Sequence, residues 1–277
     1  MKKRKSKIAA ALLGSIIIIL LILFFISPHS TALCKSKSHF IKHQINKMVF
    51  YEPGAEENAK KIVTFLPAAI KRVELIHGLP FEEPFKIYIC NTQKSFNEYT
   101  ANSSSLAYPI RGTAMLGDVL IAPSAFNFMG IDTHKETLMH ELSHLHFQQK
   151  LDFFERRKHP VWFSEGFADY VAGSGGEGIE ENEAINFILS GKHFIPEEEG
   201  EIFGSFSNAL NGLSGPMFHM QARIFVTYLI ESDSLKFKSF LRKIEMGESF
   251  SETFESLFGT GVHSKWTQFL SQLMIEK

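Results

Sequence analysis

Apolar positions follow two different rhythms along the chain. Over residues 55–77 they recur every three or four positions, as in a helix that buries one face. Pro67 lies inside this stretch, so we expect a break or kink there, and Gly78 is well placed to end the helix. Residues 84–90 and 112–122 instead alternate or are rich in β-branched and aromatic side chains. They predict one strand and then a second strand or hairpin.

Residues 132–150 form the clearest predicted helix in the middle of the chain. Thr133 and Glu136 stand at the spacing of a capping box before an apolar pattern. A proline then breaks the chain, and residues 162–172 form a second helix that ends at Gly173. Other helices are expected at 92–100, 217–231, 235–245, 249–258 and 263–275.

The order of these elements indicates the fold class. Residues 191–216 contain many Gly, Ser and Glu and show no clear period, which is typical of a long loop. The first half of the chain is mixed α and β, and the part from about residue 179 is helical. This order predicts an α+β fold with a small mixed or antiparallel sheet, a helical lobe and a cleft between them.

The N-terminus has the pattern of a membrane anchor. Residues 8–26 carry no charge, and a helix of about 19 residues nearly spans a hydrocarbon core. The basic segment 1–7 precedes them, so the positive-inside rule puts it in the cytoplasm and the rest of the chain outside. Residues 27–47 are polar and predict a stalk. The folded domain is then expected at 48–277.

A cleaved signal peptide is the alternative to an anchor. The apolar stretch is long for a signal peptide, but Ser30-Thr31-Ala32 could serve as its cleavage site. A lipoprotein signal is disfavoured because Leu33, which is not small, precedes Cys34. Both interpretations put the folded part outside the cytoplasm, held at the membrane in the first and secreted in the second.

Composition narrows the class of protein. The formal net charge is -1 and the dense group of positive residues is N-terminal, so we expect no nucleic-acid partner. Two cysteines, Cys34 and Cys90, are too few for a disulfide framework or a cysteine-type zinc site. Cys90 ends an apolar run and predicts a buried thiol. A bridge between the two stays open in an oxidising compartment.

The sequence His-Glu-Leu-Ser-His at 140–144 carries the candidate chemistry. Residues four apart on a helix lie on one face, so the imidazoles of His140 and His144 can reach a single zinc ion. Glu141 is rotated by about 100° from His140, which places it beside the metal rather than on it. Two solvated histidines on a helix face are the plain alternative.

The next predicted helix offers the missing ligand. A catalytic zinc needs a third protein ligand and an open position, and Glu165 follows on this helix. Asp169 lies one turn further and could accept a hydrogen bond from the far nitrogen of a ligating imidazole. Both carboxylates stand among large apolar residues, where burial without a partner would be costly.

HELSH followed by WFSEGFADY at 162–170 resembles the gluzincin metallopeptidases, the thermolysin-like and aminopeptidase-like group. The resemblance covers about 85–275 and is strongest to a bacterial subgroup with a W-x-x-E-G-x-A-x-Y segment. It implies a zincin-like fold and a substrate-binding edge strand near 113–122. It implies one zinc ion per chain held by His140, His144 and Glu165, with Glu141 as general base and Asp169 as partner of a ligand histidine.

The same family supplies a Tyr or His that stabilises the oxyanion. His219 falls where the subgroup usually has Tyr, so it is either a catalytic donor or an ordinary surface histidine. Tyr228 competes for the role but sits in an apolar pattern typical of the core. His146 faces another side of its helix and His134 lies in the first turn, so both are expected to be structural or solvated.

These features predict a zinc metallopeptidase, anchored in the bacterial cell membrane with its catalytic domain outside, that hydrolyses peptide bonds in a peptide or protein substrate. Glu141 would take a proton from a zinc-activated water and deliver it to the leaving amine. An endopeptidase is preferred because no amine-anchoring motif precedes the zinc helix. The alternatives are a zinc-containing but proteolytically inactive envelope binding module, and a membrane-anchored structural protein without metal.

Overall fold

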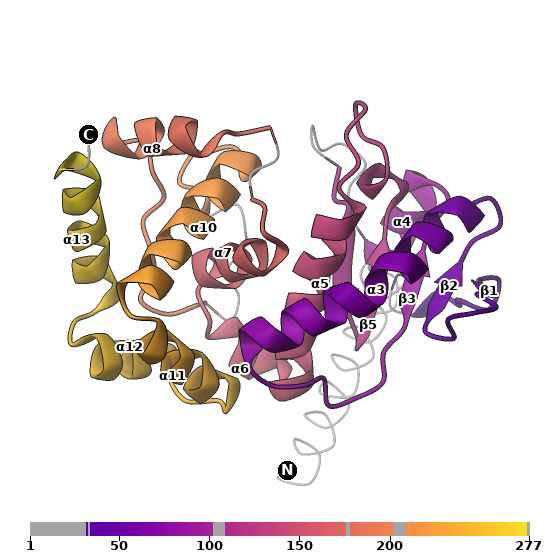
Figure 1. Ribbon diagram of the computed structural model, residues 1–277, viewed down its shortest axis with the longest axis horizontal. Coiled ribbons are helices and arrows are strands. Elements are labelled where there is room, and N and C mark those ends of the chain that lie inside the picture. The colour runs from indigo at the N-terminus through magenta and orange to yellow at the C-terminus, as the bar shows by residue number, and fades with distance from the viewer. Residues whose placement is uncertain (1–31, 33, 102–108, 176–177, 202–208, 276–277) are drawn as a thin grey trace, which may run out of the picture.

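The computed structural model describes residues 32, 34–101, 109–175, 178–201 and 209–275 (Figure 1). The basic segment and the predicted anchor at 8–26 lie outside these residues. Within the described ranges, no helix combines the length and apolar character needed to cross a bilayer.

Among the described residues, five strands form one mixed sheet in the order β1-β2-β3-β5-β4. Their bounds are β1 Ile41–Lys42, β2 Val49–Tyr51, β3 Ile87–Ile89, β4 Gly112–Met115 and β5 Asp118–Ile121. The three central strands β2, β3 and β5 are parallel, and β1 and β4 run antiparallel to their neighbours at the two edges. The predicted α+β fold with a small mixed sheet is confirmed.

Helices cover both faces of the sheet. On one face, β-strand residues such as Ile87 and Ile121 join the main core with helices α3 (Glu56–His77) and α5 (His134–Lys150). On the other face, Tyr88 and Leu120 pack with aromatic side chains of α4 (Gln93–Thr100). Helix α5 packs between the sheet and the helical part (Figure 1), and most of its residues are buried.

The second part of the molecule is helical. Its elements are α6 (Phe153–Arg157), α7 (Val161–Ala172), α8 (Glu181–Leu189), α10 (Gly215–Ser232), α11 (Ser234–Glu245), α12 (Phe250–Phe258) and α13 (Val262–Ile275). Figure 1 shows α8 and α10 to α13 at the end opposite the sheet, with α5 and α7 between them. Helices α7 and α10 pack very closely, because a Cβ added to Gly166 would lie 2.6 Å from the backbone carbonyl of Ala222.

Most predicted elements are present, but Pro67 does not break its helix. Helix α3 runs continuously from Glu56 to His77 and ends at Gly78, whose φ is 79° and whose N–H donates to Glu74 O at 2.8 Å. Pro67 is exposed, so the carbonyl it leaves without an intrahelical partner lies near solvent. Residues 112–122, predicted as a second strand or a hairpin, form the β4–β5 hairpin.

The predicted capping box at Thr133 and Glu136 is wrong. The hydroxyl of Thr133 donates to Ala125 O at 3.3 Å and lies 3.3 Å from Arg111 Nη1, so it makes no bond to the helix. The carboxylate of Asp132 instead accepts the N–H of His134 at 3.3 Å. Thr133 therefore makes tertiary hydrogen bonds in place of the helix cap that the sequence spacing predicted.

Two stretches expected to be irregular belong to the packed fold. Within the predicted stalk, Ile41 and Lys42 pair with β2, and Phe40 is buried against Tyr88. Within the predicted loop 191–216, Phe194 is buried and packs against aromatic rings of the helical part. Both described cysteines are free thiols, so the Cys34–Cys90 bridge is absent, and Cys90 is buried as expected.

Candidate metal centre

Helices α5 and α7 bring three ligand-type side chains to one point. The Nε2 atoms of His140 and His144 lie 3.0 Å apart, and they lie 3.3 and 3.4 Å from Oε2 of Glu165. Ligands about 2.0–2.1 Å from a tetrahedral zinc ion lie about 3.3 Å from one another. The three donor atoms therefore fit three corners of a zinc site and leave the fourth corner open.

Asp169 orients one of these ligands. Its Oδ1 accepts a hydrogen bond from Nδ1 of His140 at 2.8 Å. A proton held on Nδ1 leaves Nε2 of a neutral imidazole with its lone pair directed at Glu165 and His144. Asp169 lies one turn after Glu165 on α7, and it is where the sequence predicted a partner for a ligand histidine.

The electrostatics of the triangle favour a positive charge within it. Burial alone would lower the pKa of His140, but the charge of Asp169 and hydrogen bonds to Asp169 and Glu165 raise it well above its ordinary value. Burial alone would raise the pKa of Glu165, but the charge of His144 and hydrogen bonds from both histidines lower it well below its ordinary value. The same arrangement of charges attracts a metal cation, which competes with protons for the donor atoms.

Glu141 flanks the triangle on the side of the sheet. Burial raises the pKa of its carboxyl against the opposing charges of His140 and His144. The backbone N–H of Ala114 in β4 donates to this carboxyl, so the edge strand holds it in place. A buried carboxyl with a raised pKa suits a group that must both accept and release a proton.

Gly112 makes room for Glu141. A Cβ at this position would lie 2.6 Å from Cγ and 2.9 Å from Oε1 of Glu141, closer than side chains tolerate. Sequence reasoning missed this role, although a glycine inside a strand pattern is a known sign of close approach by another group.

The edge of the sheet borders the same site. Ala122 N donates to Arg111 O, and antiparallel pairing alternates, so the backbone groups of Gly112 and Ala114 face away from β5. Ala114 already engages α5, because its carbonyl accepts from Gln148 Nε2 at 2.7 Å. The outward backbone of Gly112 lines the cavity.

A large cavity opens over the three ligand-type residues. Its volume is about 1130 Å³, and it is lined by β4 on one side and by α5, α7 and the start of α10 on the others. The side chains of His140, His144 and Glu165 are between 16% and 23% exposed to it. The triangle is therefore open on one face, as a site that binds a substrate must be.

His219 joins the site through the same carboxylate that holds His140. Its Nδ1 donates to the second oxygen of Asp169, Oδ2, at 2.7 Å, and its ring lies 6.0 Å from that of His140. Burial alone would lower the pKa of His219, but the charge of Asp169 and their hydrogen bond raise it. The double use of Asp169 has no signal in the sequence, because His219 lies on a helix far along the chain.

The other candidate side chains lie elsewhere. Tyr228 packs between Phe225 and Phe269, away from the residues that line the cavity. His134 stacks on Phe126 and is hydrogen-bonded to Asp132. His146 points away from the cavity into a buried polar cluster described below.

No protein-family model matches the chain, and neither does any curated protein. The case for a metal centre therefore rests on the geometry of these side chains. Within the described residues, two groups of histidine and carboxylate donors converge closely enough to hold an ion, and His140, His144 and Glu165 form the one that faces the cavity.

Proposed function

We propose that this chain is a zinc-dependent metallopeptidase of the gluzincin type with a zincin-like fold. The observation that carries the proposal is the open triangle of His140, His144 and Glu165 with the buried carboxyl of Glu141 beside it. A structural site would be closed by a fourth protein ligand, whereas this one faces a cavity. The proposal includes one zinc ion at this site in each chain.

Each side chain has a distinct task in peptide hydrolysis. Zinc bound by the triangle would supply Lewis acidity, which polarises a carbonyl and lowers the pKa of water. Glu141 accepts the proton of the attacking water and passes it to the leaving amine nitrogen. His219 in its protonated form donates a hydrogen bond to the oxygen that gains charge during the attack. Asp169 fixes the rings of both His140 and His219.

The substrate of this proposal is an extended peptide. The outward backbone groups of Gly112 can pair with such a chain at the edge of the sheet, next to Glu141. The cavity extends from this edge past the triangle to α6, where Arg156 and Arg157 line it. A site open along this length suits a chain that continues on both sides of the cleaved bond, which supports an endopeptidase.

The proposal places the catalytic domain outside the bacterial cytoplasm. Its support is the uncharged segment 8–26 behind a basic N-terminus. Sequencing the N-terminus of the mature protein in the membrane and secreted fractions distinguishes an anchor from a cleaved signal. An intact N-terminus in the membrane fraction supports the anchor, and a new N-terminus after Ala32 in the secreted fraction supports cleavage.

Replacement of the general base tests the function directly. The full-length chain, its Glu141→Gln variant and a Glu136→Gln control are loaded with zinc and incubated with an unstructured protein such as casein. Loss of a general base lowers hydrolysis by about 10²–10⁴-fold. Zinc content should be unchanged in both variants, and Glu136→Gln, which alters a carboxylate of the same helix and cavity, should retain hydrolysis.

Two results would reject the peptidase. Equal hydrolysis by the parent and Glu141→Gln would mean that a contaminating protease is responsible. Full zinc loading of a parent that cleaves no unstructured substrate would favour the second candidate, an inactive zinc-containing module that binds partners through the cavity.

A further inference from the structure

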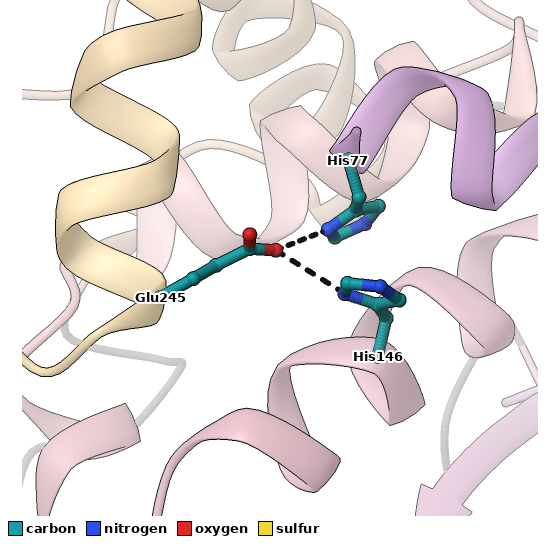
Figure 2. A group of neighbouring side chains, drawn as sticks. All are labelled: His77, His146 and Glu245. Atoms are coloured by element: carbon teal, nitrogen blue, oxygen red, sulfur yellow. Dashed lines mark hydrogen bonds and ion pairs between the residues drawn. The ribbon is translucent and has the colours of Figure 1, made fainter. Parts of the chain in front are cut away.

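A second group of histidines and carboxylate lies buried on the far side of α5. His77 is the last residue of α3, His146 lies on α5, and Glu245 is the last residue of α11. Their side chains are 0%, 0% and 1% exposed. Figure 2 shows that both imidazoles point at the carboxylate of Glu245 from separate helices.

One carboxylate oxygen contacts both rings. Oε1 of Glu245 lies 2.6 Å from Nδ1 of His77 and 3.2 Å from Nδ1 of His146. The ring centroids of the two histidines are 4.1 Å apart. Three ionisable groups thus share a space from which water is excluded, and this is unfavourable unless their charges and protons are matched.

The hydrogen bonds around His146 do not satisfy every polar atom of this cluster. Its Nε2 lies 3.0 Å from the carbonyl oxygen of Leu79, which can only accept, so Nε2 carries the proton. In the neutral ring, Nδ1 then directs a lone pair at an oxygen of Glu245. Neither His146 Nδ1 nor the second oxygen of Glu245, Oε2, makes a hydrogen bond among the described residues. A cation placed between these two buried atoms would satisfy both of them.

His77 can present the same kind of donor. Its Nε2 lies 3.0 Å from the hydroxyl of Ser143, which can accept a hydrogen bond from a protonated Nε2. With the proton on Nε2, Nδ1 is free to bind a cation. Burial lowers the pKa of His77 to about 4, which keeps the ring in the neutral form that metals require.

We propose that His77, His146 and Glu245 bind a second divalent transition-metal ion in a buried site away from the cavity. The two Nδ1 atoms and the carboxylate of Glu245 supply three ligands of the types that bind zinc in proteins, from three separate helices. Two imidazoles and one carboxylate are donors that suit zinc and other late first-row divalent ions. Ser143 and the carbonyl of Leu79 orient the two rings from behind, as the partners of metal-bound histidines do.

The ion would replace the hydrogen bond between His77 and Glu245. Donor atoms of a tetrahedral site stand about 3.3 Å apart, so these two groups separate slightly on binding. The site is independent of the one in the cavity, because its ligands face the opposite side of α5. It would connect helix α3 beside the sheet to helix α11 of the helical part through residues 168 positions apart in sequence.

Metal content distinguishes the two sites. The full-length chain is loaded with zinc, freed of excess metal and analysed by mass spectrometry as the parent, Glu165→Ala, Glu245→Gln and the double variant. We expect about two ions per chain in the parent, about one in each single variant and none in the double variant. Glu245→Gln keeps the shape of the side chain but removes the charge that the metal needs.

A second measurement does not depend on the folding of Glu245→Gln. Cobalt added to the Glu165→Ala variant should give the visible absorption bands of a tetrahedral site and raise the Tm. A folded Glu165→Ala chain that binds neither zinc nor cobalt would overturn this inference, and a proton shared with His146 would then account for the cluster. An ion retained by Glu165→Ala but lost from Glu245→Gln in a parent that binds only one would instead overturn the zinc site in the cavity.

Discussion

Asp169 shows how much of the candidate site depends on a single side chain. Each of its oxygens accepts a hydrogen bond from a different imidazole, His140 on α5 and His219 on α10. Its own pKa is lowered, because the charges of His219 and His140 and their hydrogen bonds outweigh the effect of burial. One carboxylate therefore sets the orientation of a ligand and of the proposed oxyanion donor together.

We expect Asp169→Asn to weaken zinc binding by about 10–100-fold. An amide has one acceptor oxygen, so it can hold only one of the two rings and directs an N–H at the other. Competition with a chromophoric chelator measures the affinity, with Glu136→Gln as a control that leaves the triangle intact. Parent-like affinity in Asp169→Asn would show that the ligand histidines keep their orientation without this contact.

Gly112→Ala should lower hydrolysis and spare zinc binding. The added methyl group would displace Glu141, whose Cγ lies 2.6 Å from its position, and misplaced catalytic groups typically cost about 10²-fold in rate. Gly215→Ala is the matched control, because it also lines the cavity and its added Cβ meets no atom within 4 Å. Equal rates for the two variants would contradict the assigned position of the general base.

At the scale of elements, the junction of α6 and α7 buries an ionisable group. His159 packs against the rings of Phe147, Phe163 and Phe250, and burial lowers its pKa from 6.5 to about 4. Below pH 6.5 the unfolded chain takes up a proton that the folded chain does not. Stability is therefore lost as the pH falls from 6.5 towards 4, and it is regained above this window.

Urea unfolding with a chelator present, so that metal binding does not contribute, measures this loss. The free energy of unfolding should fall by up to about 1.4 kcal/mol per pH unit for each histidine that stays neutral when folded, and His77 acts in the same direction. His159→Gln should make the slope shallower. An unchanged slope in that variant would show that His159 does not control acid stability.

The elements also show what could be predicted from the sequence. His140 and His144 stand four apart on one helix, so the sequence alone predicts that they share a face. Glu165 on a second helix was expected beside them because a catalytic zinc needs a third ligand and because of the resemblance to the gluzincins. The predicted ends of the last four helices lie within two residues of the observed ends, because the apolar pattern of a helix is local. Strand β1 has only two residues, Ile41 and Lys42, which is too short for any period to identify it.

At the scale of the whole molecule, the buried cluster marks the limit of such reasoning. His77 continues the buried stripe of α3, and a polar residue in an apolar stripe is a signal of a partner. That partner, Glu245, comes from the other end of the chain, and no spacing rule connects the two. Tertiary packing brought them together, as it also diverted Thr133 from its predicted cap.

The burial of most of α5 has a consequence for amide hydrogen exchange. Most residues of α5 are buried although one face lines the cavity, so its hydrogen-bonded amides exchange only when the helix itself opens. We expect these amides to exchange at the rate of global unfolding, far more slowly than those of the edge strand β1. Fast exchange along α5 would reveal a partial opening in which His140 and His144 part from Glu165 while the rest of the protein stays folded. Slow exchange would mean that the proposed centre persists for as long as the native state itself.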